Sequence, residues 1–282
     1  MEQKPGMDFV VIGAMKAATS TVCGYLERHP DVHMVPGCEP NYFNLDKNYE
    51  KGPDWYATFL DNPAPGRICG EGSNDYAARD CFPDVAERIH AYNPGMKIIY
   101  MVRHPLDRII SAWIQVRVQG GDDVPPSLDK TVQQLPDLFV GQSRYWHNLA
   151  PFRERFAEDQ IFVGFMEDLN TDPETFYASL CDFLEISPMQ LQKELRANPS
   201  AGKRVPSHLY TVINRIPLVS TLKKFLPRGL RDTVKKYVLS KPASARPEFS
   251  AGVKQQLVAD LSGDSANLLR HYGKPADFWK LG

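Results

Sequence analysis

A lysine and a cluster of hydroxyl residues follow an apolar run near the start of this 282-residue chain. The run DFVVIG ends at Gly13, Lys16 comes three residues later, and the hydroxyl residues that follow are Thr19, Ser20 and Thr21. Where a buried strand leads into a helix in this way, the first N–H groups of the helix lack partners and carry the positive end of its dipole. Together with the lysine, these groups predict an anion site.

The position of the lysine separates this loop from a nucleoside triphosphate loop. A Walker A loop, G-x-x-x-x-G-K-[ST], places a hydroxyl residue directly after its lysine to hold Mg²⁺. Here Lys16 is followed by Ala17 and Ala18, which keep the loop small enough for the backbone to approach a ligand. We therefore predict a P-loop-like nucleotide site that is not a Walker A loop.

A second apolar run, KIIYMV, is followed directly by Arg103. A kinase or NTPase would use an acidic metal ligand at such a strand end. An arginine at the end of a buried strand suits bidentate phosphate binding, so Arg103 is a candidate phosphate ligand. The helix predicted after Pro105 carries a polar stripe of Arg108, Ser111 and Gln115 beside its apolar face. On this stripe, Ser111 is placed to face the same ligand.

The elements that position these side chains alternate along the chain. Continuous apolar runs predict strands at 8–13, 32–35, 67–71, 97–102 and 160–165. Helical periodicity and capping signals predict helices at 19–29, 82–92, 105–118 and 173–184. This alternation predicts an α/β fold: a three-layer α/β/α arrangement around a central parallel sheet of about five strands. In such sheets ligands bind outside the carboxyl ends of the strands.

The remaining segments complete a single predicted domain over 1–282. Residues 119–143 are expected to form a long loop, and 248–282 to form closing helices of a helical C-terminal part. Between Lys203 and Arg246 there are eleven Lys or Arg residues and one acidic residue. We interpret the stretch 197–247 as a basic helical flap within the domain.

Composition limits the class of protein. A hydrophobic share of 43% and a charged share of 24% are ordinary for a globular protein, and the net charge of −1 argues against a bulk nucleic-acid binder. The five cysteines show no pairing or metal-ligand spacing, so we expect reduced thiols and no metal. The start has no signal-peptide pattern and no apolar run reaches ~18 residues, so we expect a cytoplasmic protein without a membrane span.

The two anion motifs together carry a family resemblance. GAMKAATST and RHPLDRIISAW resemble the 5′-phosphosulfate loop and the 3′-phosphate site of the sulfotransferases that use 3′-phosphoadenosine 5′-phosphosulfate (PAPS). The segments HPDVHMVPGCEPNYFN, GEGSNDYA, FVGFMEDLNTDPETFYASLCDFLEI and NPSAGKRVPSHL are similar to later segments of that family, in the same order. The family commonly has glycine at position 18, and the alanine here permits close approach if its φ is negative.

The resemblance implies roles for individual residues. PAPS would be held by residues 16–21, by Arg103 and Ser111, and by a closing loop made of Gly202, Lys203 and Arg204. Lys16 would stabilise the leaving phosphate, and Glu39 would be the base that takes the proton of a hydroxyl acceptor. Asn41, where glycan-acting members often have histidine, would contact the acceptor, as would the two residues that follow the third strand, Ser73 and Tyr76. Glu71 is interpreted as bracing that same loop.

Two other functions stay open at this point. An NTP-dependent phosphotransferase would need Mg²⁺, whereas PAP binding by a sulfotransferase would survive EDTA. A non-catalytic nucleotide or polyanion binder would use the 203–246 segment and bind in a salt-sensitive way without Lys16. The sequence specifies neither the acceptor, which is a small molecule, a lipid or a sugar, nor the oligomeric state.

Overall fold

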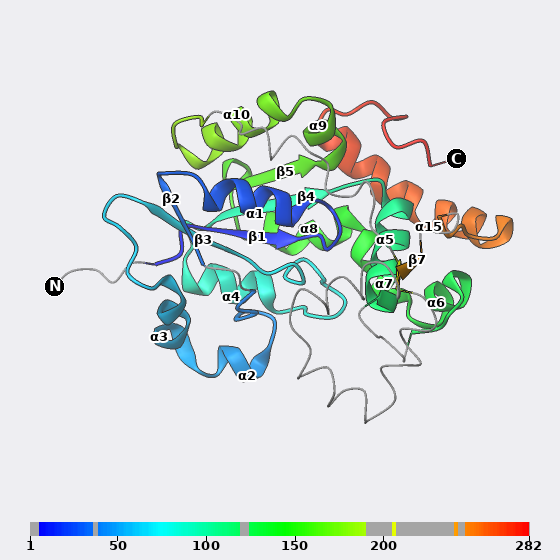
Figure 1. Ribbon diagram of the computed structural model, residues 1–282, viewed down its shortest axis with the longest axis horizontal. Helices are drawn as coiled ribbons and strands as arrows, with labels where there is room; N and C mark the ends of the chain where they lie inside the picture. The colour runs from blue at the N-terminus through cyan, green and yellow to red at the C-terminus, as the bar shows by residue number, and fades with distance from the viewer. Residues whose placement is uncertain are drawn as a thin grey trace.

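The computed structural model describes residues 6–35, 39–118, 124–189, 205–206, 240–241 and 246–281. Its centre is a five-stranded parallel sheet in the order β2-β3-β1-β4-β5 (Figure 1). The strands are β1 (Phe9–Gly13), β2 (Val32–Met34), β3 (Ile68–Gly72), β4 (Lys97–Val102) and β5 (Ile161–Phe165). All five lie within two residues of the predicted bounds. Every residue of β1 is buried, as expected for a strand covered on both faces.

Helices cover both faces of this sheet and confirm the three-layer α/β/α prediction (Figure 1). On one face α1 (Thr19–Glu27) packs against β3, where Gly72 lies beside Cys23, and α10 (Pro173–Leu184) packs against β5, where Gly164 lies beside Phe176. On the other face, α8 (Tyr145–Arg153) brings Tyr145 against Tyr100 of β4.

The remaining described helices lie around these layers and range from single turns to the 21 residues of the C-terminal helix α15. They are α2 (Asp46–Tyr49), α3 (Gly52–Ala57), η1 (Thr58–Leu60), α4 (Val85–Tyr92), α5 (Pro105–Val118), α6 (Leu128–Gln134), α7 (Pro136–Phe139), η2 (Gly141–Ser143), η3 (Glu158–Gln160), α9 (Met166–Thr171) and α15 (Ala251–His271). The bounds of α5 and α10 are those predicted. None of the described helices combines the length and the apolar character needed to cross a membrane.

The expectation of a long loop over 119–143 is wrong for its described part, 124–143. Ser127 caps α6 by accepting a hydrogen bond from the Lys130 N–H at 3.4 Å, and α7 begins at Pro136. Val132 and Phe139 are buried in a second apolar cluster with α5, and Leu128 is buried as well. The helical spacing of the apolar residues in α6 and α7 was missed because the preceding segment GGDDVPPS is rich in residues typical of loops.

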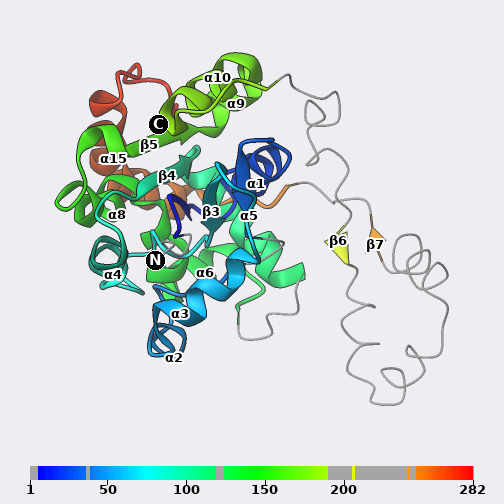
Figure 2. The same ribbon diagram turned by 90° about the vertical axis from the view of Figure 1, so that its left-hand side faces the viewer.

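The C-terminal part also differs from its prediction. After residue 248 there is one helix, α15, followed by turns, rather than several helices. Within the predicted helical flap at 197–247, four described residues form a short antiparallel pair, β6 (Val205–Pro206) with β7 (Ser240–Lys241), which lies beside the main body (Figure 2). Residues 246 and 247 are in no helix or strand, and the other residues of that stretch lie outside the described part.

Helix α15 joins the two apolar clusters of the molecule. Leu257 and Leu261 belong to the cluster around α5, α6 and α7, whereas Leu268 and Leu269 belong to the main cluster around the sheet. Trp279, beyond the helix, also packs in the main cluster, 5.7 Å from the ring of Tyr145. The C-terminal segment thereby completes both clusters.

Candidate active site

Three loops meet at one edge of the sheet. Because the strands are all parallel, their carboxyl ends share this edge, and the chain leaves β1, β3 and β4 there. The loop after β1 carries Lys16, the loop after β3 carries Ser73 to Tyr76, and the turn after β4 carries Arg103. The loop after β2, described from Glu39 onward, reaches the same edge through its contacts with the β3 loop.

The first loop ends in a helix whose N-terminus has no side-chain cap. Helix α1 begins at Thr19 after Ala18, and no side chain of the loop hydrogen-bonds to its first N–H groups. Thr19, Ser20 and Thr21 lie in its first turn, and none of their hydroxyls caps it. Since no acidic residue lies in that turn either, the free N–H groups and the positive end of the dipole suit an anion from outside the helix.

The backbone of this loop is left-handed at two non-glycine residues. Lys16 has φ 75° and Ala18 has φ 67°, so the condition that Ala18 has a negative φ is not met. An L-residue in this region costs roughly 1–2 kcal/mol relative to its usual conformations. Ala18 nonetheless takes the conformation for which glycine is the usual residue. The loop therefore keeps the backbone conformation expected with glycine at position 18, and the alanine there is strained.

The turn after β4 contacts the first loop directly. The Arg103 Nη1 donates a hydrogen bond to the Lys16 carbonyl at 3.0 Å, and the Lys16 Nζ donates to Gln115 Oε1 of α5 at 2.5 Å. Arg103 also lies 3.8 Å from a carboxylate oxygen of Asp107. Two cations from separate strands are thus brought together beside the N-terminus of α1. Ser111 is half-buried on the second turn of α5, and its contact with a phosphate stays a prediction.

Arg108 does not belong to the polar stripe predicted for α5. Its side chain is fully buried and donates hydrogen bonds to Ser143 Oγ at 2.5 Å, to Gln142 Oε1 at 3.3 Å and to the Phe139 carbonyl. Burial lowers the pKa of this guanidinium. Arg108 therefore holds the segment after α7 against α5 from inside the protein. The stripe that faces the loops consists of Ser111 and Gln115.

Glu39 is held by the loop that follows β3. Its Oε1 accepts a hydrogen bond from Asn74 Nδ2, and its backbone carbonyl accepts one from Asn41 Nδ2 at 2.8 Å. Partial burial raises the pKa of the Glu39 carboxyl, and the nearby charge of Asp75 raises it further, while the bond from Asn74 opposes them. A raised pKa makes a carboxylate a stronger base.

Gly13 allows the loop after β3, whose Asn74 bonds to Glu39, to lie close to the start of the Lys16 loop. A Cβ at position 13 would lie 2.6 Å from the Asn74 carbonyl oxygen, and the φ of Gly13 is +134°. The neighbouring Ala77 N–H donates to the Ile12 carbonyl at 2.9 Å. Asn74, the partner of Glu39, is thereby packed on the last residue of β1, three residues before Lys16. This contact brings the candidate base and the candidate cation to one site.

Ser73 and Tyr76, predicted to contact the acceptor, are buried beneath the Glu39 loop. They are 0% and 1% exposed, and the Ser73 hydroxyl donates to Glu71 Oε2 at 2.8 Å. Their burial does not fit the prediction of acceptor contact and makes them supports of the loop. Glu71 was expected to brace the loop after β3, and it accepts the hydrogen bond from Ser73 of that loop. Asn41, which has φ 50°, is half-buried, and its acceptor contact stays a prediction.

Some predicted and some unforeseen residues remain to be placed. Gly202, Lys203 and Arg204 lie outside the described residues. Asn74 and Gln115 were not predicted as site residues, because nothing in an asparagine or glutamine marks which loop it will contact. The signal available for Asn74 was its place among the polar residues that follow β3.

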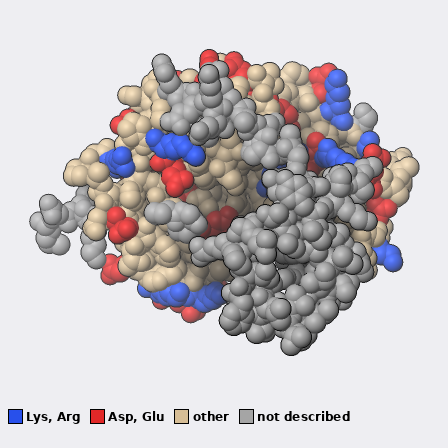
Figure 3. All heavy atoms as spheres, in the orientation of Figure 1, with Lys and Arg blue, Asp and Glu red and all other residues tan. Residues whose placement is uncertain are grey.

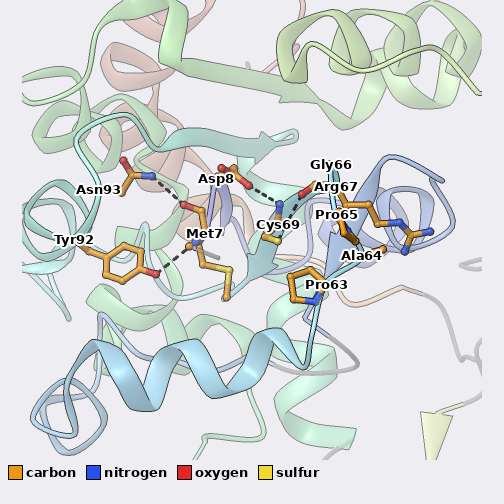
Figure 4. A pocket seen from close by; sticks show the side chains of 11 residues that line it. Met7, Asp8, Pro63, Ala64, Pro65, Gly66, Arg67, Cys69, Tyr92 and Asn93 are labelled. Carbon is orange, nitrogen blue, oxygen red and sulfur yellow. Dashed lines mark hydrogen bonds between the residues drawn. The ribbon is translucent and has the colours of Figure 1, made fainter. Parts of the chain in front are cut away.

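Other parts of the described chain hold a cavity and free thiols but no cluster of metal ligands. Within these residues, no group of three or more His, Cys, Asp or Glu side chains is arranged to hold a metal ion. A cavity of about 750 Å³ lies at the opposite edge of the sheet, beside the amino ends of β1 and β3, and is lined by Met7, Asp8 and Arg67 among others (Figure 4). Cys23, Cys69, Cys81 and Cys181 are free thiols, as expected, and Cys38 lies outside the described residues.

Comparison with known proteins agrees with this fold. Residues 8–235 match the sulfotransferase domain family. Over 200 residues the chain is 28% identical to mouse heparan sulfate glucosamine 3-O-sulfotransferase 3B1, which covers 68% of this chain and 50% of that protein. The chain thus spans about half the length of the curated relatives it matches.

Two solved structures share the fold. A sulfotransferase from Alicyclobacillus acidocaldarius superposes with a TM-score of 0.67 at 19% identity, covering 98% of this chain and 99% of that one. A mouse sulfotransferase complexed with PAP gives a TM-score of 0.50 at 15% identity, covering 94% and 89%. At these identities the likeness shows the α/β fold alone. The family match, which spans most of the chain, shows that this protein belongs to the sulfotransferase family.

Proposed function

We propose that this protein transfers the sulfuryl group of PAPS to a hydroxyl of an acceptor and releases PAP and a sulfate ester. In this reaction a bond forms between the acceptor oxygen and sulfur, and the bond from sulfur to the bridging phosphate oxygen breaks. The electron pair of that bond goes to the 5′-phosphate of PAP. The hydroxyl proton needs a base, and the leaving phosphate needs a cation.

The single observation that carries the proposal is the pairing of Lys16 and Arg103 at the N-terminus of α1. The 3.0 Å bond from Arg103 to the Lys16 carbonyl fixes two cations from β1 and β4 beside uncapped helical N–H groups. This set of donors fits a nucleotide with two separated phosphate groups better than a single anion. It supports Lys16 at the phosphosulfate and Arg103, with Ser111, at the 3′-phosphate.

Glu39 is the proposed base. It lies on the neighbouring loop, has a raised pKa, and is oriented by Asn74, which packs against the end of β1. When its carboxylate is ionised it accepts the acceptor proton as the hydroxyl attacks sulfur. Lys16 stays protonated and stabilises the negative charge that grows on the bridging oxygen.

The acceptor is proposed by chemical class. The relative named above is, by its name, an enzyme that sulfates a hydroxyl of glucosamine in heparan sulfate. We infer a hydroxyl acceptor for this chain as well: a small molecule, a lipid or a sugar. Asn41 stands where glycan-acting members often have histidine, and its amide is engaged with the Glu39 carbonyl. This difference favours an acceptor other than the heparan sulfate of that relative.

The two alternative functions receive less support. A phosphotransferase would need an acidic metal ligand at the end of β4, where the chain has Arg103. On the visible described surface, Lys and Arg are interspersed with Asp and Glu in small groups (Figure 3), and most of the 203–246 segment that a polyanion binder would use lies outside the described residues. We also infer a cytoplasmic location from the unpaired cysteines, which cell fractionation would test.

The test is a screen of hydroxyl acceptors with sulfur-labelled PAPS in the presence of EDTA. We expect label to appear in at least one acceptor, together with PAP, and PAP to bind without a divalent metal. The Lys16→Ala variant, assayed beside the wild type, should lose transfer. Activity that depends strictly on added Mg²⁺, or salt-sensitive polyanion binding that is unchanged in Lys16→Ala, would contradict the proposal.

A further inference from the structure

Glu71 is a fully buried carboxylate that the proposed reaction does not use. It is the fourth residue of β3, and its side chain is 0% exposed. The Tyr56 hydroxyl of α3 donates to its Oε1 at 3.0 Å, and the Ser73 hydroxyl donates to its Oε2 at 2.8 Å. The Tyr76 hydroxyl lies close enough to this carboxyl group to lower its pKa. Three hydroxyls therefore converge on one carboxyl group inside the protein.

Two of these hydroxyls also accept hydrogen bonds from the loop that carries Glu39. Ser73 Oγ accepts from the Asn41 N–H at 3.1 Å. The Tyr76 oxygen accepts from the next two backbone N–H groups, those of Tyr42 at 3.0 Å and Phe43 at 3.4 Å. Three successive amides of the loop thereby bond to two hydroxyls, of which that of Ser73 donates to Glu71 and that of Tyr76 lies close to it. The third hydroxyl, that of Tyr56, has no such connection to a loop amide in the described contacts.

The direction of this relay depends on the charge of Glu71. A hydroxyl has one hydrogen to donate and two lone pairs to accept with. An ionised carboxylate only accepts, so Ser73 donates to it and keeps a lone pair directed to the Asn41 N–H. The hydrogen of the neighbouring Tyr76 hydroxyl is likewise attracted to the carboxylate, which leaves its lone pairs to the N–H groups of Tyr42 and Phe43. A protonated Glu71 is itself a donor, and it then competes with the hydroxyl hydrogen for the same space. The hydroxyl hydrogens can all point toward the Glu71 carboxyl group only when that group is ionised.

We propose that ionised Glu71 is a positioning residue that holds the loop amides of residues 41–43, and thereby Glu39, in the arrangement needed for catalysis. The inference rests on the proposed function in one respect, namely that Glu39 is the base. It assigns Glu71 no contact with the reacting atoms. Its action passes through Ser73 and Tyr76 to the backbone of the loop.

The surroundings of Glu71 make this arrangement sensitive to pH. Burial, together with a smaller effect of the Glu39 charge, raises its pKa to about 7, while the three hydroxyls partly oppose this rise. The titratable groups that act on it are Tyr56 from α3, Tyr76 from its own loop, Glu39 from the β2 loop and Cys23 from α1. We therefore expect the relay to weaken as the pH falls through about 7.

Hydrogen–deuterium exchange of the peptide that contains residues 39–44 measures the relay without any substrate. In the wild type, protection of these amides, corrected for the intrinsic pH dependence of exchange, should fall as the pH drops from about 8.5 to 6. Glu71→Gln should lower protection at least about tenfold at the higher pH, because the hydroxyls that accept from the loop amides lose their carboxylate acceptor. Ser73→Ala should expose the amide of residue 41 alone.

Tyr56→Phe is the matched control. It removes a donor from the same carboxylate and keeps the ring, but it leaves both connections to the loop intact. At about pH 8.5 its loop protection should stay within about twofold of the wild type. Equal loss of protection in Tyr56→Phe and Glu71→Gln would reduce Glu71 to a general core role and overturn the inference. So would wild-type protection in Glu71→Gln, or in Ser73→Ala if Glu71→Gln does not fold.

Turnover provides the second measurement. Glu71→Gln should lower kcat about tenfold or more with PAP affinity unchanged, and its kcat should no longer drop as the pH falls through about 7. If the exchange results hold but the wild type transfers no sulfuryl group, the proposed function fails and the positioning of the loop stands. If transfer occurs but Glu71→Gln keeps the wild-type kcat and pH profile, the inference fails and the proposed function stands.

Discussion

Glu39 and Lys16 have separate tasks in the proposed reaction, and mutation should separate them. Glu39→Gln keeps the shape and removes the base, so kcat should fall by ~10²–10⁴. PAP affinity should stay within about twofold, because Glu39 makes no necessary contact with the nucleotide. Lys16→Ala should lose both affinity and rate, since lysine acts in ground and transition states alike. Steady-state kinetics and PAP titration give both signatures.

Near-normal kcat in Glu39→Gln would mean that another group is the base. His33 is then the first candidate, because it is half-buried on β2 and its Nε2 has no hydrogen-bond partner in the described structure.

Arg103 should discriminate between nucleotides by the 3′-phosphate. A hydrogen bond to a charged group contributes about 1.5–3 kcal/mol, so Arg103→Ala should weaken PAP binding at least about tenfold. Adenosine 5′-phosphosulfate lacks the 3′-phosphate and should lose much less. A small loss is expected for it too, because Arg103 also holds the Lys16 carbonyl. Calorimetric titration of both ligands measures the difference, and equal losses would contradict the assignment.

Glu71 should make the fold less stable as the pH rises. Its pKa is raised from 4.5 to about 7 in the folded state, so between these values the folded protein binds the proton more tightly than the unfolded chain does. The free energy of unfolding should therefore fall with rising pH across this window, by up to about 3 kcal/mol from this group. Urea unfolding at about pH 5 and 8 should show that fall, and Glu71→Gln should lack this part of it. An unchanged pH dependence in the variant would contradict the assigned pKa.

At the scale of elements, the close approach of two loops depends on Gly13. Gly13→Ala would set a methyl group against the Asn74 carbonyl at a φ of +134°, and backbone on both sides must move. Overpacking of this kind costs typically about 1–3 kcal/mol. We expect that loss in urea unfolding, together with lower kcat, because Asn74 no longer orients Glu39.

Gly263→Ala is the control for that substitution. Gly263 lies inside α15, where an added Cβ meets nothing within 4 Å. Because alanine is a better helix former, the variant should be more stable by about 0.5–1 kcal/mol with unchanged kcat. Equal effects of the two substitutions would exclude a special role for Gly13.

The elements were largely predictable from the sequence because they depend on local patterns. Continuous apolar runs marked the five strands, and a proline in the first turn together with an apolar period fixed α5 and α10. The same logic failed at α6 and α7, since turn residues before them masked a short period. It failed at Arg108 as well, because a charged residue beside an apolar helical face is ordinarily exposed.

The site was predictable only in part. Lys16 and Arg103 follow strand ends, and this placement is visible in the sequence. The contacts from Gly13 to Asn74 and from Glu71 through Ser73 and Tyr76 to the Glu39 loop join segments far apart in the chain. No local pattern encodes which loops meet, so these contacts required the structure.

For the whole molecule, we predict one cooperative unfolding transition. The two apolar clusters share α15, so neither is complete without it. Far-ultraviolet circular dichroism and tryptophan fluorescence should therefore give the same urea midpoint, as two-state unfolding requires. Two separated transitions would instead indicate that 1–282 contains more than one domain.

The position of α15 in the chain also bears on how the protein is made. All five strands of the sheet are synthesised before residue 166, whereas α15 begins at Ala251. A growing chain on the ribosome therefore carries a full set of strands while the partners of Leu257, Leu261, Leu268 and Leu269 still await them. During that interval exposed apolar surface is available to chaperones or to aggregation. Synthesis speed between residues 166 and 271 should consequently influence how much of the newly made chain reaches the folded state.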